Sequence, residues 1–483
     1  MDGIRMTEGR MSALGRGLLA LGVAVGACLA APAAAQVRTL NDALALTYAT
    51  NPALLAARAQ LRAVDENVPQ ALSGWRPQVT ISANAGFIEG TTEQYIRPST
   101  FSRGRTIESN ALRGSNTESL TVNQPLFRGG ATRANTNRAE NQVMSQRASL
   151  IGSEQTAFTN AANAYVSVIQ TGQVLALTIN NELVLRRQLQ ATQERFRVGE
   201  ITRTDVAQAE AGLAGATANR QTAEGELQTA RSAFLQVIGE PAPDRLVEPQ
   251  PLRLPVRSVD EVRALAASNN PAVIAAMFND AVARDNFDIQ YARLMPNLSL
   301  QGSISRNEDV QTKDLTTKVG QVLMVLSIPL YQGGGEYAAI RQARQAQQQT
   351  RQQVDDARRQ AIQQVTQAWT TYVSAKATIE STRQQIRSNE IALEGVQREA
   401  IVGSRTTLDV LNEEQRLLNS RVTLVRNLGS LVTASYAVAS ASGRLTARDL
   451  NLNVPLYDET AYYKAVKNRL IGTGDYATDQ PGR

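Results

Sequence analysis

The stretch Pro125-Leu126-Phe127-Arg128-Gly129-Gly130 has a counterpart 204 residues later, Pro329-Leu330-Tyr331-Gln332-Gly333-Gly334. Proline interrupts helices and is confined to the edges and ends of strands, whereas glycine adopts backbone angles that other residues avoid. We therefore expect each proline to end a strand where the chain passes from sheet to helix, and the glycines to allow the bend. The expected junction residues are Pro125, Gly129, Gly130, Pro329, Gly333 and Gly334.

The same 204-residue offset continues along the chain and indicates an internal repeat. Upstream of the junctions the offset is 219, so the first half has a longer loop between Pro77 and Pro125. A constant offset over so long a span indicates one structural unit used twice. The matching pairs are Asn51-Pro52 with Asn270-Pro271, Pro77 with Pro296, Ala164-Tyr165 with Ala368-Trp369, Gly199 with Gly403, Asp205-Val206 with Asp409-Val410, and Gly239 with Gly443.

Proline placement divides the chain into these units. Residues 126–240 and 330–454 contain no proline, which indicates long helices because proline costs about 3 kcal/mol inside a helix. The expected parts are a first repeat at 36–240, a proline-rich linker at 241–257, a second repeat at 258–446 and a tail at 447–483. Each repeat is predicted to hold a short helix (39–72, 258–290), two strands (78–88 and 117–126, 297–306 and 319–330) and two long helices (131–197 and 204–238, 338–400 and 406–442).

The predicted long helices show a coiled-coil pattern. Between Ile340 and Ile379, apolar or small residues recur three and four apart, although 341–368 contains 11 glutamines. A disordered glutamine-rich tract is the alternative, but the seam persists through the glutamines. The seam residues are Ile340, Ala343, Thr350, Val354, Ala357, Ala361, Val365, Ala368, Tyr372, Ala375 and Ile379.

The predicted strands alternate apolar and polar residues with period two. Val79, Ile81 and Phe87 fall on one face, and Thr80 and Ser82 fall on the other. An ordinary soluble sheet with one wet face is one interpretation; a transmembrane barrel, apolar outside and polar inside, is the other. Since a membrane barrel needs at least about eight strands, four strands per chain could span a membrane only if several chains share one barrel.

The first 35 residues are predicted to be a secretory signal peptide. Arg5, Arg10 and Arg16 precede an apolar run, and Ala33-Ala34-Ala35 is a small-residue cleavage pattern before Gln36. Cleavage and lipidation at Cys28 is the alternative. Export favours the membrane interpretation of the strands.

Composition excludes several functions. The chain has no histidine and one cysteine, so it lacks Ser-His-Asp machinery, histidine-ligated metal sites and intrachain disulfides. No phosphate-binding GxxxxGK[ST] loop is present, and a net charge of +6 from 50 basic and 44 acidic residues does not indicate nucleic-acid binding. We expect no enzyme activity and no cofactor.

A tight turn joins the helices of each predicted pair. Gly199 and Gly403 suit the left-handed position that ends a helix. Thr204 or Thr406 could cap the following helix, and Asp205 and Asp409 could complement its N-terminus.

These features together resemble the TolC family of outer-membrane channel-tunnels, over roughly 39–446. The run 68–77 is most similar to the branch that serves type I protein secretion. The resemblance implies a mixed α and β membrane protein. Three chains with four strands each would form a 12-stranded barrel, continued by a helical periplasmic tunnel. The family-like stretches are Leu40-Asn41-Asp42-Ala43-Leu44, Asn51-Pro52, Ser73-Gly74-Trp75-Arg76-Pro77, Gln124 to Gly130 and the two turns.

The resemblance also implies a gate at the closed periplasmic end. Asp409 matches the first acidic position of the family's aperture ring, whereas the second position is Asn412, which halves the expected ring charge. Arg405 matches the latch arginine, with Thr204 and Asp205 as its expected partners, while the latch tyrosine position is Ala400.

The function implied by the resemblance is an outer-membrane exit duct. Its expected partners are two further copies of the chain, outer-membrane lipid, a periplasmic adaptor and an inner-membrane pump driven by ATP or protons. The cargo would be unfolded secreted protein, small toxic compounds, or both; dedicated multidrug efflux is the alternative. A nutrient porin and an exported structural coiled-coil protein are more distant alternatives. The four strands per chain disfavour the porin, and the alternating strands disfavour the coiled-coil protein.

Overall fold

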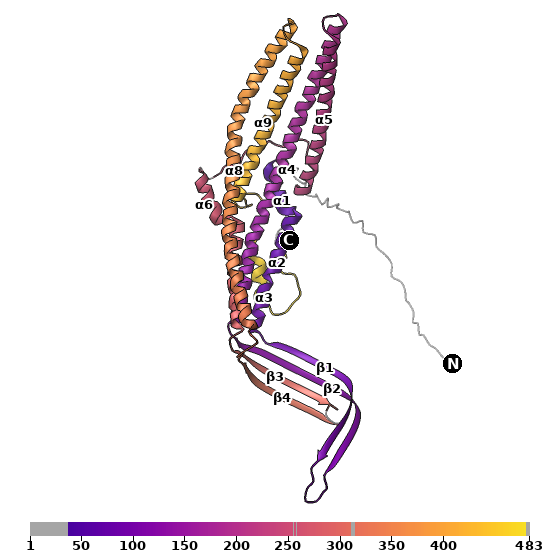
Figure 1. The fold of residues 1–483 in the computed structure, drawn as a ribbon, viewed down its shortest axis with the longest axis vertical. Coiled ribbons are helices and arrows are strands. Elements are labelled where there is room, and N and C mark those ends of the chain that lie inside the picture. The colour runs from indigo at the N-terminus through magenta and orange to yellow at the C-terminus, as the bar shows by residue number, and fades with distance from the viewer. Residues whose placement is uncertain (1–36, 255, 257, 311–313, 480–483) are drawn as a thin grey trace, which may run out of the picture. The chain divides into compact units, whose positions relative to one another are not determined.

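A computed structural model describes residues 37–479, except 255, 257 and 311–313 (Figure 1). The predicted signal peptide, 1–35, and Cys28 lie outside the described residues. The chain from Val37 onward forms one unit.

Two helices of 67 residues dominate this unit, and each packs along a shorter partner (Figure 1). At 1.5 Å per residue, each long helix extends about 100 Å. The long helices are α4 (Ala131–Arg197) and α8 (Gly335–Ile401), and their partners are α5 (Arg203–Ile238) and α9 (Thr407–Ala441). In the part of the chain that the structure describes, no helix is apolar over enough residues to cross a membrane.

Short helices replace the single helix predicted before each pair of strands. The prediction of one helix over 39–72 and one over 258–290 is wrong because Asn51 and Asn270 each cap a new helix that begins with proline at its first position. The segments are α1 (Leu40–Thr50), α2 (Pro52–Asp65), α3 (Asn67–Leu72) and a 3₁₀ turn (Ser73–Trp75) in the first half, and α6 (Val259–Asn269) and α7 (Pro271–Ala292) in the second. A last helix, α10 (Ala461–Val466), lies in the tail.

Four antiparallel strands form one sheet in the order β1-β2-β3-β4 (Figure 1). They are β1 (Gln78–Ile96), β2 (Arg105–Arg128), β3 (Asn297–Glu308) and β4 (Thr316–Ser327). The first hairpin is much longer than predicted: residues 89–96 and 105–116, which lie between the predicted strands 78–88 and 117–126, are paired within β1 and β2. The apolar–polar alternation did not predict these residues as strands. A strand exposed on both faces needs no apolar side chains, because its backbone hydrogen bonds form without them.

Pro125 does not end its strand as predicted. The strand continues to Arg128, and the register against β3 shifts between Pro125 and Phe127. A bulge is one of the few places where a sheet tolerates proline. Pro329 does lie beyond its strand, which ends at Ser327.

The register places apolar side chains side by side on one face of the sheet. Ile81 pairs with Leu120, which pairs with Ile304, and directly paired residues share a face. Ile81, Ile304 and Val322 are 79%, 65% and 74% exposed in the single chain. The opposite face is polar over β1, β2 and β3, with Thr80, Thr121, Ser303, Ser82, Ser119 and Ser305. The sheet therefore presents an uncovered apolar face opposite a largely polar one.

Small residues line the seams between the long helices. In α5, Ala209, Ala216, Ala223 and Ala230 are buried at seven-residue intervals, which is the spacing of a coiled-coil seam. In α8, every residue of the seam predicted between Ile340 and Ile379 is buried or half-buried, so the predicted helix is confirmed and the disordered alternative is wrong.

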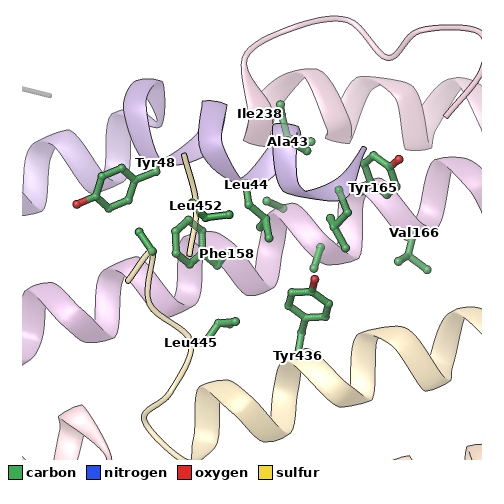
Figure 2. Close-up of a cluster of buried hydrophobic side chains, with 14 of the residues drawn as sticks. Ala43, Leu44, Tyr48, Phe158, Tyr165, Val166, Ile238, Tyr436, Leu445 and Leu452 are labelled. Atoms are coloured by element: carbon green, nitrogen blue, oxygen red, sulfur yellow. The ribbon is translucent and has the colours of Figure 1, made fainter. Parts of the chain in front are cut away.

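The largest apolar cluster lies where α1 packs on α4 (Figure 2). Tyr48 and Leu44 of α1 meet Phe158 of α4, and Tyr436 of α9 closes the cluster from the other side. Tyr165 places its hydroxyl oxygen 2.8 Å from the carbonyl oxygens of Arg38 and Val247. These contacts hold the segment before α1 and the proline-rich linker against α4.

Candidate functional site

The turn between α4 and α5 is built from a left-handed glycine and a capping box. Gly199 has φ of +79°, as the sequence predicted, and the Glu200 amide donates back to the Arg195 carbonyl at 3.0 Å. Thr202 then caps α5: its hydroxyl accepts from the Asp205 amide at 3.4 Å, and Asp205 Oδ2 accepts from the Thr202 amide at 3.0 Å.

The turn between α8 and α9 has the same construction. Gly403 has φ of +78°, and the Ser404 amide donates to the Glu399 carbonyl at 3.0 Å. Thr406 accepts from the Asp409 amide at 3.3 Å, and Asp409 Oδ2 accepts from the Thr406 amide at 3.0 Å.

The predicted capping roles are confirmed for Asp205, Asp409 and Thr406, and the one for Thr204 is wrong. Thr202 caps α5, which leaves Thr204 in the first helical turn. The sequence held the signal that identifies Thr202: it precedes Asp205 by three residues, and Thr406 precedes Asp409 by the same interval.

Capping keeps both aspartates ionised. Hydrogen bonds from the Thr202 hydroxyl and amide lower the pKa of Asp205. Hydrogen bonds from the Thr406 amide and hydroxyl likewise lower the pKa of Asp409. A carboxylate that accepts such bonds is stabilised in its charged form, so each turn carries a fixed negative charge at its helix start.

The structure does not bring the predicted latch residues together within one chain. Arg405 Nε donates to Glu399 Oε2 at 2.8 Å, and this bond raises the pKa of Arg405. Among the described residues, no hydrogen bond joins Arg405 to Thr204 or Asp205. Glu399, in the last turn of α8, is therefore a residue of this site that the sequence interpretation missed; it lies six positions before Arg405, a spacing with no general meaning in a sequence.

Asp409 and Asn412 lie on one side of the first turns of α9, since residues three apart on a helix are neighbours. Asp409 is half-buried and Asn412 is exposed. The amide supplies no charge, so α9 contributes one carboxylate from this pair. Within the described residues, no group of three or more Cys, Asp or Glu side chains is placed to hold a metal ion.

The strand-to-helix junctions use the predicted glycines. Gly129 and Gly130 have φ of +60° and +89°, and Gly333 and Gly334 have φ of +65° and +81°. Each pair ends on the residue that caps a 67-residue helix. At Gly129 a side-chain carbon would also lie 2.6 Å from the Ala292 carbonyl oxygen. Left-handed backbone and close approach together explain a glycine there.

The sequence profile described as "Outer membrane efflux protein" matches residues 43–240 and 262–444. The outer membrane efflux protein BepC of Brucella suis is 35% identical over 459 residues, which are 94% of this chain and 96% of that protein. The chain belongs to the outer membrane efflux protein family. The outer membrane protein TolC of Escherichia coli is 24% identical over 86% of this chain and 84% of TolC, so the TolC resemblance is confirmed.

Two further similarities bear on fold and function. The solved structure of CusC, described with transmembrane channel formation, superposes with a TM-score of 0.72 at 15% identity and covers 84% of this chain and 92% of that one. The alkaline protease secretion protein AprF of Pseudomonas aeruginosa is 26% identical over 69% of this chain and 70% of AprF.

Membership fixes the general role of the protein. It is an outer-membrane exit duct with a mostly helical periplasmic tunnel. The family consists of channel proteins and not of enzymes.

Proposed function

We propose that three copies of this chain form one 12-stranded barrel continued by a tunnel of 12 helices, and that the assembly passes cargo from an inner-membrane pump to the exterior. The observation that carries the proposal is the open sheet. Its apolar face is exposed, and its edge strands, β1 and β4, have no partner on their outer side in the described chain. Bare strand edges associate, and edges cannot be left unpaired in a bilayer.

The two halves of the chain support a repeated unit in this assembly. Each half supplies two strands followed by a 67-residue helix and a capped helix of 35 or 36 residues. Six such units arranged around one axis would give a wall of near-equivalent helix pairs.

Disulfide trapping tests the shared barrel. Residues 37–483 contain no cysteine, so Ser82→Cys on β1 can be combined with a cysteine scanned along β4 from Gln321. We expect a covalent trimer at one register, and native mass measurement should give three chains. A stable monomer, or a mixture of oligomers with no favoured register, contradicts the proposal.

We further propose that the two turns form the gate. Asp409 and Asn412 would line the aperture, and Arg405 of one chain would meet Thr204 and Asp205 of a neighbour. The pairing is supported by the exposure of Arg405 and by the ionised Asp205. On closure of the gate, Arg405 would exchange the carboxylate of Glu399 for that of Asp205, so the change in free energy between the open and closed states would be small.

Conductance in planar bilayers tests the latch. Arg405→Ala combined with Asp205→Ala should raise conductance, because both partners are lost. Thr202→Ala is the matched control for the lost helix cap, and Glu399→Gln is the control for the lost intrachain partner. If Thr202→Ala opens the channel as much as the double variant, the latch assignment fails.

For cargo, we propose unfolded secreted protein delivered by an adaptor and an ATP-driven pump, with efflux of small compounds as the second candidate. The names of AprF and BepC support the two cargoes respectively. A deletion strain separates them: loss of a secreted protein without antibiotic sensitivity supports secretion alone, whereas sensitivity without a secretion defect supports efflux alone.

A further inference from the structure

The C-terminal tail follows the first helices of the chain toward the sheet. The Tyr457 amide donates to the Tyr48 hydroxyl at 3.0 Å, and the Tyr462 hydroxyl donates to Glu66 Oε1 at 2.8 Å. Arg76 Nη1 then donates to the carbonyl of residue 469 at 3.0 Å. Tail positions 457, 462 and 469 thus meet positions 48, 66 and 76 in the same order, so the tail runs alongside α1, α2 and α3 toward the start of β1.

The tail is held firmly until it reaches that end. Tyr463 packs against the cluster around Val68, and Lys467 Nζ forms a 3.0 Å ion pair with Glu140. The next two apolar side chains are largely uncovered: Leu470 is 74% exposed and Ile471 is 90% exposed. The tail is thus anchored to α3 and α4, and directly after these contacts it exposes two apolar side chains.

The start of β1, which Arg76 joins to residue 469, also carries exposed apolar side chains. The Trp75 carbonyl accepts from Gln124 Nε2 at 3.0 Å, and Gln124 is paired with Leu300 on the apolar face. Trp75 is 50% exposed, and Val79 just beyond it is 63% exposed. Tryptophan is enriched where a membrane meets water, so the surface formed by Trp75 and Val79 fits a membrane interface.

We propose that Leu470 and Ile471 form a wedge that inserts into the periplasmic leaflet of the outer membrane, with phospholipid as its occupant. The proposal rests on the proposed function, because lipid reaches the wedge only if the apolar face of β1 meets the bilayer. The hydrogen bond from Arg76 to residue 469 brings the wedge to the start of β1, and this proximity to the apolar face identifies lipid as the occupant. Arg76 and Arg469 supply cations for lipid phosphates. The wedge would set the depth of the duct in the membrane and give the tail a function.

Tryptophan fluorescence in nanodiscs tests the wedge on the full trimer. The two native tryptophans, Trp75 and Trp369, are replaced by phenylalanine, and Ile471→Trp is the probe. The nanodiscs contain phosphatidylethanolamine and phosphatidylglycerol with or without brominated acyl chains. Val79→Trp is the lipid-facing reference, and Ile391→Trp, at a position 71% exposed on α8, is the water-facing reference.

We expect brominated lipid to quench the probe at 471 nearly as strongly as the probe at 79, and iodide in the buffer to quench it less than the probe at 391. Quenching at 79 but not at 471 overturns the wedge and leaves the barrel intact, whereas loss of quenching at both positions contradicts the barrel itself. Protection of 471 from both quenchers would place it against a neighbouring chain and also overturns the wedge. Leu470→Trp repeats the measurement if Ile471→Trp does not assemble.

Discussion

Asp65 offers a quantitative test of how burial acts on this fold. It ends α2 and is 1% exposed, and neither carboxylate oxygen has a hydrogen-bond partner among the described residues. Burial raises its pKa from 3.8 to about 7, against the opposing effect of Arg147. The groups that face it are Arg147, Glu66, Arg62 and Glu459.

The sign follows from proton linkage. Between the unfolded and folded pKa values the folded state binds more protons, so stability falls as pH rises through this window. A neutral carboxamide in place of the Asp65 carboxyl does not titrate, so the variant does not lose stability as the pH rises through this window. The stability of Asp65→Asn relative to the parent should therefore increase by about 3 kcal/mol between pH 5 and pH 8.

Urea unfolding followed by far-UV circular dichroism at the two pH values measures the difference. Asp244→Asn is the matched control, because the Asp244 side chain is 98% exposed. A gain for Asp65→Asn that grows with pH supports the reasoning. If the variant is less stable than the parent near pH 8, the arginines stabilise a charged Asp65 and the reasoning is wrong.

Two other substitutions follow from the junctions and the aperture. Gly129→Ala should give much less folded trimer than Gly130→Ala. Both glycines have positive φ, but only at Gly129 would the added carbon clash with the Ala292 carbonyl oxygen. The amount of trimer that resists dissociation in detergent measures the difference. Asn412→Asp should add a second carboxylate beside Asp409 and strengthen block by multivalent cations in planar bilayers. Equal yields for the two glycine variants, or unchanged block for Asn412→Asp, would contradict these assignments.

Much of the fold could be predicted because its signals are local. The 67 residues of α4 occupy the predicted range 131–197, since a long run without proline and with coiled-coil spacing favours a helix wherever it packs. The glycines of both turns were predictable for the same reason, because a left-handed residue after a helix is a local requirement. Even Thr202 was within reach, since its spacing from Asp205 is a local signal.

The long helices, the turns that join them and the strand alternation could be predicted from the sequence alone, because each depends on residues a few positions apart. The folded chain was needed to find the extended β1–β2 hairpin and the path of the tail along α1, α2 and α3, which depend on distant residues. It was also needed to find the pairing of Arg405 with Glu399, which has no recognisable sequence spacing. Polar strand residues carry no pattern when both faces are wet, and contacts such as Tyr462 with Glu66 join positions 396 residues apart. Such contacts arise from packing of the whole chain, which no short stretch of sequence encodes.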